Sequence, residues 1–174
     1  MDDRVTVAVQ LGRDPRGTLD VVARCQYGLP LVIRTSPRLD DGSPFPTLYY
    51  LTCPVAARQI GRLEAAGTMR DMERRLEEDE QLRAAYVSAH ERYMAQRDAI
   101  SVLDESASAG GMPLRVKCLH ALYAHERADG NPIGAIVRDR IEPIDCPGPC
   151  VEDVDGRASA TLGHPGFAGK KRRR

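Results

Sequence analysis

The stretch Leu19-Asp-Val-Val-Ala-Arg-Cys25 decides the fold because its apolar and polar side chains alternate. Leu19, Val21, Ala23 and Cys25 share one face, which is typical of a half-buried strand. Further along, residues 31–33 and the β-branched and aromatic residues 47–53 predict two more strands, with a Pro-, Asp- and Gly-rich loop at 37–46 between them. Three strands joined by short links predict a small antiparallel sheet near the N-terminus.

Helical patterns flank this sheet on both sides. Residues 2–11 predict a short helix, and Pro54 favours the start of a second helix that Gly67 ends. Apolar residues then recur at helical spacing. The further helices are expected at about 69–76, 79–103, 113–130 and 132–140. The expected fold is α+β, with the sheet packed against four or five helices. We expect one domain over residues 1–154 and a disordered tail over 155–174.

The charge of the 174-residue chain is unevenly distributed. It holds 25 basic and 25 acidic residues, but residues 170–174 are all basic, so residues 1–169 hold 20 basic against 25 acidic ones. An acidic body with no Trp and only two Phe argues against a base-stacking surface. Nucleic acid is therefore expected to contact the basic tail at most, through non-specific attraction.

The N-terminus, Met-Asp-Asp-Arg-Val, lacks the apolar region of a signal peptide. No apolar run approaches the ~20 residues that span a bilayer. We therefore expect a cytoplasmic protein without a membrane span. Its five cysteines should be reduced there, and their odd number argues against a disulfide framework.

The cysteines carry most of the functional information. Cys25 and Cys53 each end a predicted strand, and Cys146-Pro-Gly-Pro-Cys150 has the spacing of a structural zinc knuckle. Cys118 falls in the predicted helix 113–130. Thiolates are soft ligands that suit zinc or an iron–sulfur cluster. The simpler alternative is that these thiols pack as small apolar groups.

Two histidines follow Cys118 along the predicted helix. His125 is seven residues on and would share its face, whereas His120 would lie about 200° away and could not easily share an ion with it. Cys118 and His125 could also form a thiolate–imidazole pair in an enzyme. The sequence has no nucleophile elbow or oxyanion-hole motif, so an enzyme is the less favoured interpretation.

Cations offer another candidate site. Converging guanidinium groups can hold phosphate, but neither a Walker loop nor a Gly-rich dinucleotide fingerprint is present, and a solvated charged rim is the simpler interpretation. The candidate phosphate-binding residues are Arg13, Arg34, Arg38, Arg115 and Lys117.

Three long phrases resemble a known family. They are Pro37-Arg-Leu-Asp-Asp-Gly-Ser-Pro-Phe-Pro-Thr-Leu-Tyr-Tyr-Leu-Thr-Cys-Pro54, Leu63-Glu-Ala-Ala-Gly67 and Gly110-Gly-Met-Pro-Leu-Arg-Val-Lys-Cys-Leu-His-Ala-Leu-Tyr-Ala-His125. Over about residues 8–135 the chain resembles the domain of unknown function 501 family, found mainly in actinobacteria, which has no established activity. Its relatives carry His at the position of Cys53, and this resemblance implies a zinc ligand there.

The expected function is a non-enzymatic cytoplasmic binding or regulatory protein with an unidentified protein partner, stabilised by zinc or, as the alternative, by an iron–sulfur cluster. The favoured metal ligands are Cys25, Cys53, Cys118 and Cys150, with His125 and Cys146 as further candidates. Four protein ligands would leave zinc no open position, so its role would be structural. The competing hypotheses are the Cys118/His125 enzyme and the phosphate site.

Overall fold

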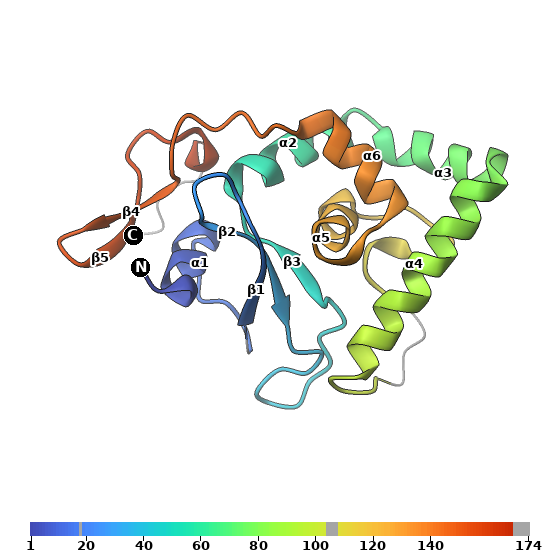
Figure 1. Ribbon diagram of the computed structural model, residues 1–174, viewed down its shortest axis with the longest axis horizontal. Coiled ribbons are helices and arrows are strands. Elements are labelled where there is room, and N and C mark those ends of the chain that lie inside the picture. Colours follow the sequence, from blue (N-terminus) through green and yellow to red (C-terminus); the bar gives the residue numbers. More distant parts are fainter. Residues whose placement is uncertain (18, 104–107, 169–174) are drawn as a thin grey trace.

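The computed structural model describes residues 1–17, 19–103 and 108–168. Its central sheet has three antiparallel strands in the order β1-β2-β3 (Figure 1). Ile33 is the register partner of both Val21 and Tyr50. The predicted sheet is therefore confirmed, although its third strand is shorter than residues 47–53. The strands are β1 (Leu19–Arg24), β2 (Pro30–Thr35) and β3 (Tyr49–Leu51).

The described residues form six α-helices, against the four or five expected, and the α+β class is confirmed. Two predicted boundaries were wrong: the long helix ends at Asp98 rather than near 103, and the helix expected from Pro113 begins only at Leu119. The helices are α1 (Asp3–Leu11), α2 (Pro54–Ala65), α3 (Thr68–Glu78), α4 (Glu80–Asp98), α5 (Leu119–Asp129) and α6 (Pro132–Ile141), with a 3₁₀ turn η1 (Ala109–Gly111).

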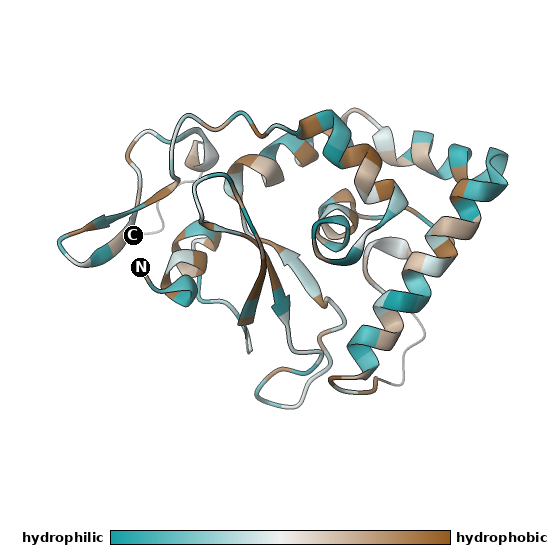
Figure 2. Ribbon diagram, in the orientation of Figure 1, coloured by the Kyte–Doolittle hydropathy of each residue, from teal (hydrophilic) through white to brown (hydrophobic). Residues whose placement is uncertain are grey.

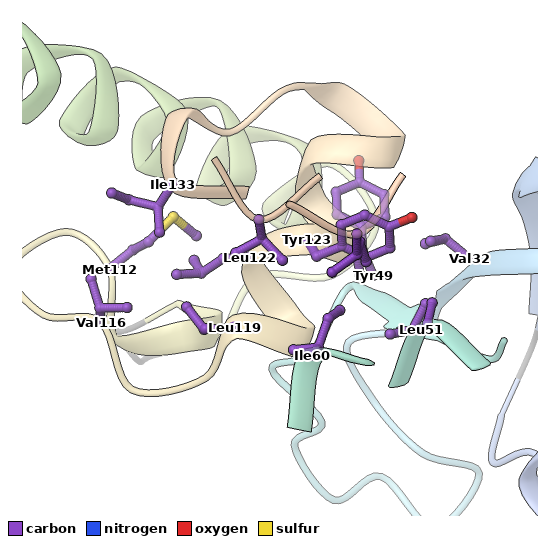
Figure 3. Packing of buried hydrophobic residues seen from close by; sticks show 14 of the residues in the cluster. Val32, Tyr49, Leu51, Ile60, Met112, Val116, Leu119, Leu122, Tyr123 and Ile133 are labelled. Carbon is purple, nitrogen blue, oxygen red and sulfur yellow. The ribbon is translucent and has the colours of Figure 1, made fainter. Parts of the chain in front are cut away.

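Helix α5 occupies the centre of the molecule, between the sheet and α6 (Figure 1). Figure 3 shows its Leu119, Leu122 and Tyr123 in one apolar cluster with Ile60 of α2 and Leu51 of β3. The outer helices α3 and α4 carry long hydrophilic stretches (Figure 2). The burial of α5 from several sides therefore fixes its position relative to α2 and β3.

Helix α6 approaches α5 at a glycine. A Cβ atom on Gly134 would stand 2.2 Å from the carbonyl oxygen of Leu122 and 2.6 Å from the Cβ of Glu126. Real Cβ atoms do not come so close, so the backbones can pack at this distance only because residue 134 has no side chain.

The chain after Asp155 differs from the expected disordered tail. A second small sheet pairs β4 (Val151–Val154) with β5 (Arg157–Ala160), and the 3₁₀ turn η2 (Pro165–Phe167) follows it. The β5 strand packs on α1 and η2 packs on α2. These long-range contacts order a segment whose local composition favours turns. The basic cluster at 170–174 lies outside the described residues.

Candidate functional site

The site begins where α5 begins. Cys118 is the N-cap residue of this helix and has an extended backbone, with φ −153° and ψ 107°. The backbone N–H of Leu119 donates a hydrogen bond of 2.7 Å to Oε1 of Glu64, a residue of α2. A carboxylate is stabilised at a helix N-terminus, where N–H groups lack partners within the helix. Glu64 therefore ties the start of α5 to α2.

The ring of His120 lies between two oxygen acceptors. Its Nδ1 is 3.2 Å from Oε1 of Glu64, and its Nε2 is 2.9 Å from the carbonyl oxygen of Ala57. Only an imidazolium ring can donate to both oxygens at once. The hydrogen bond with Cys118 raises the pKa of His120 to about 9, against the opposing effect of burial and with the help of the Glu64 charge. His120 is therefore a cation near neutral pH.

The Cys118 thiol completes the group. One ligand-type atom from each of Glu64, Cys118 and His120 lies within 4.8 Å of the other two. Burial alone would raise the pKa of the thiol, but the hydrogen bond with His120 and the backbone N–H of Ala121 outweigh burial and lower it. A thiolate beside an imidazolium and at a helix N-terminus is the arrangement that activates cysteine nucleophiles.

Cys118 and His120 line a cleft of about 750 Å³. This volume lies within the range of small-molecule sites. The walls come from α1, β3, α2, α5 and the η2 region, so the described tail segment contributes to the cleft. Its other lining residues are Gln10, Leu11, Thr47, Tyr49, Tyr50, Leu51, Thr52, Pro54, Ala57, Arg58, Ala121, Gly166 and Ala168.

One guanidinium group belongs to this wall. Arg58 of α2 donates a hydrogen bond to the carbonyl oxygen of Ala168. Arg13 stands above the ring of Tyr50, another lining residue, at 5.9 Å from the ring centroid. The charged side chains around the cleft thus include cations, together with the carboxylate of Glu64 behind His120.

His125 does not face Cys118 in the way the sequence predicted. Its ring is fully buried, with its centroid 5.7 Å from that of Tyr49 and 5.1 Å from that of Tyr93. Its Nδ1 lies 3.2 Å from the side-chain amide of Asn131. The histidine beside Cys118 is His120. The prediction failed because it applied helical angles to Cys118, which precedes the helix and has an extended backbone.

The other four cysteines gather elsewhere. Cys25, Cys53, Cys146 and Cys150 line a second pocket of about 190 Å³, and Cys118 is not among its lining residues. The favoured metal-ligand set of Cys25, Cys53, Cys118 and Cys150 is therefore divided. Cys118 lines the large cleft, whereas Cys25, Cys53 and Cys150 share the second pocket with Cys146.

The five candidate phosphate-binding cations have separate surroundings. Arg34 pairs with Asp20 on the exposed side of the sheet, and Arg38 donates to the carbonyl oxygens of Gly42 and Val102. Arg13 donates to Tyr50, whereas Arg115 and Lys117 are exposed residues before α5. None of these contacts tests phosphate binding, so that site stays a prediction.

Sequence reasoning missed Glu64 and His120. A usable signal was the Cys-x-His spacing at a helix start, where the cysteine side chain and the second helical residue can turn toward each other. Glu64 carried no signal of its own, because a glutamate on an amphipathic helix is usually a solvated residue.

The fold and this site together define an α+β protein that groups a thiol, an imidazole and a carboxylate at a cleft. The chain belongs to the family described as protein of unknown function (DUF501), which matches residues 21–139. This range contains all three residues of the group. A comparison with curated proteins found no match. A comparison with solved structures also found none.

The longest described helix, α4 (Glu80–Asp98), has 19 residues and a mixed polar and apolar sequence. Among the described residues, no helix is both long enough and apolar enough to cross a bilayer.

Proposed function

We propose that this protein is an enzyme that uses Cys118 as a nucleophile toward an acyl compound. The observation that carries the proposal is the grouping of Glu64, His120 and Cys118, whose reactive atoms lie within 4.8 Å of one another at the wall of the large cleft. A nucleophile, a neighbouring acid–base group and an orienting third group are the parts that covalent catalysis needs.

The reaction runs in two halves. The Cys118 thiolate attacks the carbonyl carbon, the bond to the leaving group breaks, and His120 gives its proton to that group. The product of this half is a thioester on Cys118 and a neutral imidazole. Water then attacks the thioester, His120 takes a proton from it, and the carboxylic acid leaves. The thiolate and the imidazolium are restored, so the cycle needs no oxidant or reductant.

Each neighbouring group has a role in this scheme. Glu64 and the carbonyl oxygen of Ala57 hold the ring of His120 from its two nitrogens. The N–H groups at the start of α5 favour negative charge, first on the sulfur and then on the oxygen of the tetrahedral intermediate. Arg58 in the wall favours acyl compounds that carry an anionic group.

The test measures thiol reactivity and turnover together. Iodoacetamide at about pH 7 should label Cys118 faster than it labels glutathione, because a lowered thiol pKa gives more thiolate. Activated esters and thioesters should then leave an acyl group on Cys118, detected by peptide mass spectrometry. Cys118→Ser is the control and should not be acylated. Labelling of Cys118 no faster than of glutathione would contradict the proposal.

A second candidate function uses the same three residues to hold zinc in a metal-dependent hydrolase. The bond from Nε2 of His120 to the carbonyl oxygen of Ala57 would fix the tautomer that leaves Nδ1 as a ligand. Three protein ligands beside a cleft are typical of catalytic zinc, with the fourth position open to water. Zinc would protect Cys118 from iodoacetamide, and a chelator would expose it; without bound metal the chelator changes nothing.

The expected non-enzymatic role, with zinc as a structural element and an unidentified protein partner, stays a prediction. The better candidate site for a structural zinc ion is the pocket of the other four cysteines.

A further inference from the structure

The second pocket brings together cysteines that are far apart in the sequence. Cys25 begins the turn between β1 and β2, and Cys53 is the N-cap residue of α2. Cys146 and Cys150 belong to the loop between α6 and β4. All four line a pocket of about 190 Å³, so three separate chain segments meet at thiols.

Each side of the pocket is built by specific contacts. The carbonyl oxygen of Cys25 accepts from the N–H of Gly28, and its own N–H donates to the carbonyl oxygen of Leu29, which makes a tight turn. The two-proline loop then carries Cys146 and Cys150 to the opposite wall. The thiols are therefore carried by a turn, a helix start and a short loop with two prolines.

Two N–H donors point at sulfur atoms. The side-chain amide of Gln10 donates to Sγ of Cys150 at 3.6 Å. His164 accepts the N–H of Gly166 on Nδ1, so its Nε2 carries the proton. This Nε2 lies 3.3 Å from Sγ of Cys146 and 3.2 Å from the carbonyl oxygen of Gly148, to which the Cys146 thiol itself donates. Gln10 and His164 are both buried. Buried N–H donors directed at sulfur stabilise thiolates more than thiols, as the outer contacts of metal ligands do.

Two cations line the pocket, and each is paired with a carboxylate. Arg24 pairs with Asp3 at 2.6 Å, and Arg127 pairs with Glu142 at 3.5 Å. Four thiolates around one zinc ion carry two net negative charges, so N–H donors near the sulfur atoms have to stabilise that charge.

We propose that Cys25, Cys53, Cys146 and Cys150 bind one structural zinc ion that joins the sheet, the start of α2 and the loop before β4. Thiolates are ligands that zinc prefers, and the Cys-x₃-Cys spacing is that of a zinc knuckle. Binding releases the four thiol protons and forms four Zn–S bonds of about 2.3 Å. Four protein ligands leave no open position, so this zinc has no part in the chemistry proposed for Cys118.

The sulfur atoms must move together on binding. Within the ranges that the structure describes, the only three ligand-type groups within 4.8 Å of one another are those of Glu64, Cys118 and His120. No three of the four sulfur atoms in this pocket therefore lie within 4.8 Å of one another, and a tetrahedral centre would require the loop of Cys146 and Cys150 to move toward Cys25 and Cys53.

The experiment is metal analysis of the full-length protein by mass spectrometry, after extensive dialysis against a weak chelator. We expect about one zinc per chain in the unaltered protein. Cys25→Ser and Cys146→Ser should lose that zinc, and Cys118→Ser should retain it. Both altered ligands are only half-buried, so the variants are expected to fold, which circular dichroism checks.

Cobalt reports the ligand type. Cobalt in place of zinc should give the intense sulfur-to-metal absorption of a tetrahedral thiolate centre in the unaltered protein and in Cys118→Ser, and a weaker one in Cys146→Ser. Three outcomes would each overturn the proposal. They are removal of zinc from the unaltered protein by dialysis, loss of zinc only in Cys118→Ser, and the visible absorption of an iron–sulfur cluster in protein purified without air.

Discussion

Helices α2 and α5 both begin at a cysteine, yet the pKa values of the two thiols are shifted in opposite directions. Cys53 and Cys118 are each the N-cap residue of their helix and each have an extended backbone. Burial raises the pKa of Cys53 to about 11, whereas the pKa of Cys118 is lowered. The charges beside Cys53 come from other cysteines, and the charge beside Cys118 comes from the His120 imidazolium. At these two helix starts, the thiol pKa is lowered only at Cys118, where the hydrogen bond with His120 adds to the backbone N–H.

The two histidines of α5 show the same contrast. His120, at the cleft, has its pKa raised to about 9, and His125, at the buried middle of the helix, has its pKa lowered to about 4. Burial acts on both rings, but only His120 has a partner that outweighs it. The carboxylate of Asp129 lies 3.6 Å from Nε2 of His125 and does not compensate for burial there.

The largest expected effect is the acid sensitivity that His125 causes. Its pKa of about 4 lies below the unfolded value of 6.5, so the folded chain binds fewer protons between these values and loses stability as pH falls. The loss amounts to about 3 kcal/mol below pH 4. His125→Gln should remove this loss from urea unfolding curves measured at several pH values.

If the free energy of unfolding fell equally with pH in the unaltered protein and in His125→Gln, the low pKa of His125 would be contradicted. Between pH 6.5 and about 9 the two groups of the cleft act on stability in opposite directions, because folding keeps the proton on His120 and favours release of the one on Cys118. His120→Asn provides the control: it should leave the acid slope of His125 in place.

The next largest effect concerns the packing of α6 against α5. Gly134→Ala should lower the free energy of unfolding by about 1–3 kcal/mol, because its Cβ would overlap the Leu122 carbonyl. Gly61→Ala, in α2, meets nothing within 4 Å and should stabilise the protein slightly. Urea unfolding at neutral pH compares the two. Equal stability of both variants would mean that α6 does not press on α5.

A smaller change is expected when the cation beside Cys118 is removed. His120→Asn should lower the iodoacetamide rate of Cys118 at about pH 7 by about tenfold, because the thiol pKa returns toward its ordinary range. His164→Asn, beside Cys146, should leave the rate of Cys118 unchanged. A rate for His120→Asn that matches the unaltered protein would show that the helix N-terminus alone activates this thiol.

The smallest effect is expected from Glu64→Gln. The amide still accepts the Leu119 N–H, but the loss of charge should lower the pKa of His120 from about 9 toward 6.5. The substitution has two opposing effects on the pKa of Cys118. A less basic His120 should let the thiol pKa rise, whereas removal of the Glu64 charge should let it fall, because that charge raises it. Nuclear magnetic resonance titration of the His120 ring should show the shift, and the alkylation rate should change by only about two- to threefold. An unmoved His120 titration would contradict the role of Glu64.

Local pattern predicted the sheet and most of the helices well. The alternation in residues 19–25 and the β-branched strands reflect a two-residue period that needs no knowledge of the rest of the chain. The β4–β5 hairpin was missed because its composition favours turns and its order depends on packing against α1. The start of α5 was misplaced because Pro113 is a common helix-start signal, whereas residues 112–114 form a turn and Cys118 has an extended backbone.

The site was predicted only in part, for a related reason. The cysteines stood out by their chemistry, but the sequence could not show which of them meet. Glu64 lies 55 residues from Leu119, whose N–H it accepts, and such a contact leaves no local trace. His120 was set aside because helical geometry was assumed for a residue outside the helix.

The sequence by itself determined the class of the fold, the small antiparallel sheet near the N-terminus and the presence of thiols able to bind metal or act as nucleophiles. These features follow from side-chain chemistry and short-range periodicity. Only the tertiary structure decided that Cys118 faces a cleft with His120 and Glu64, while the other four cysteines share a separate pocket. The physical reason is that the pKa of a thiol depends on burial and on the nearest charge, and both are set by residues distant in the chain.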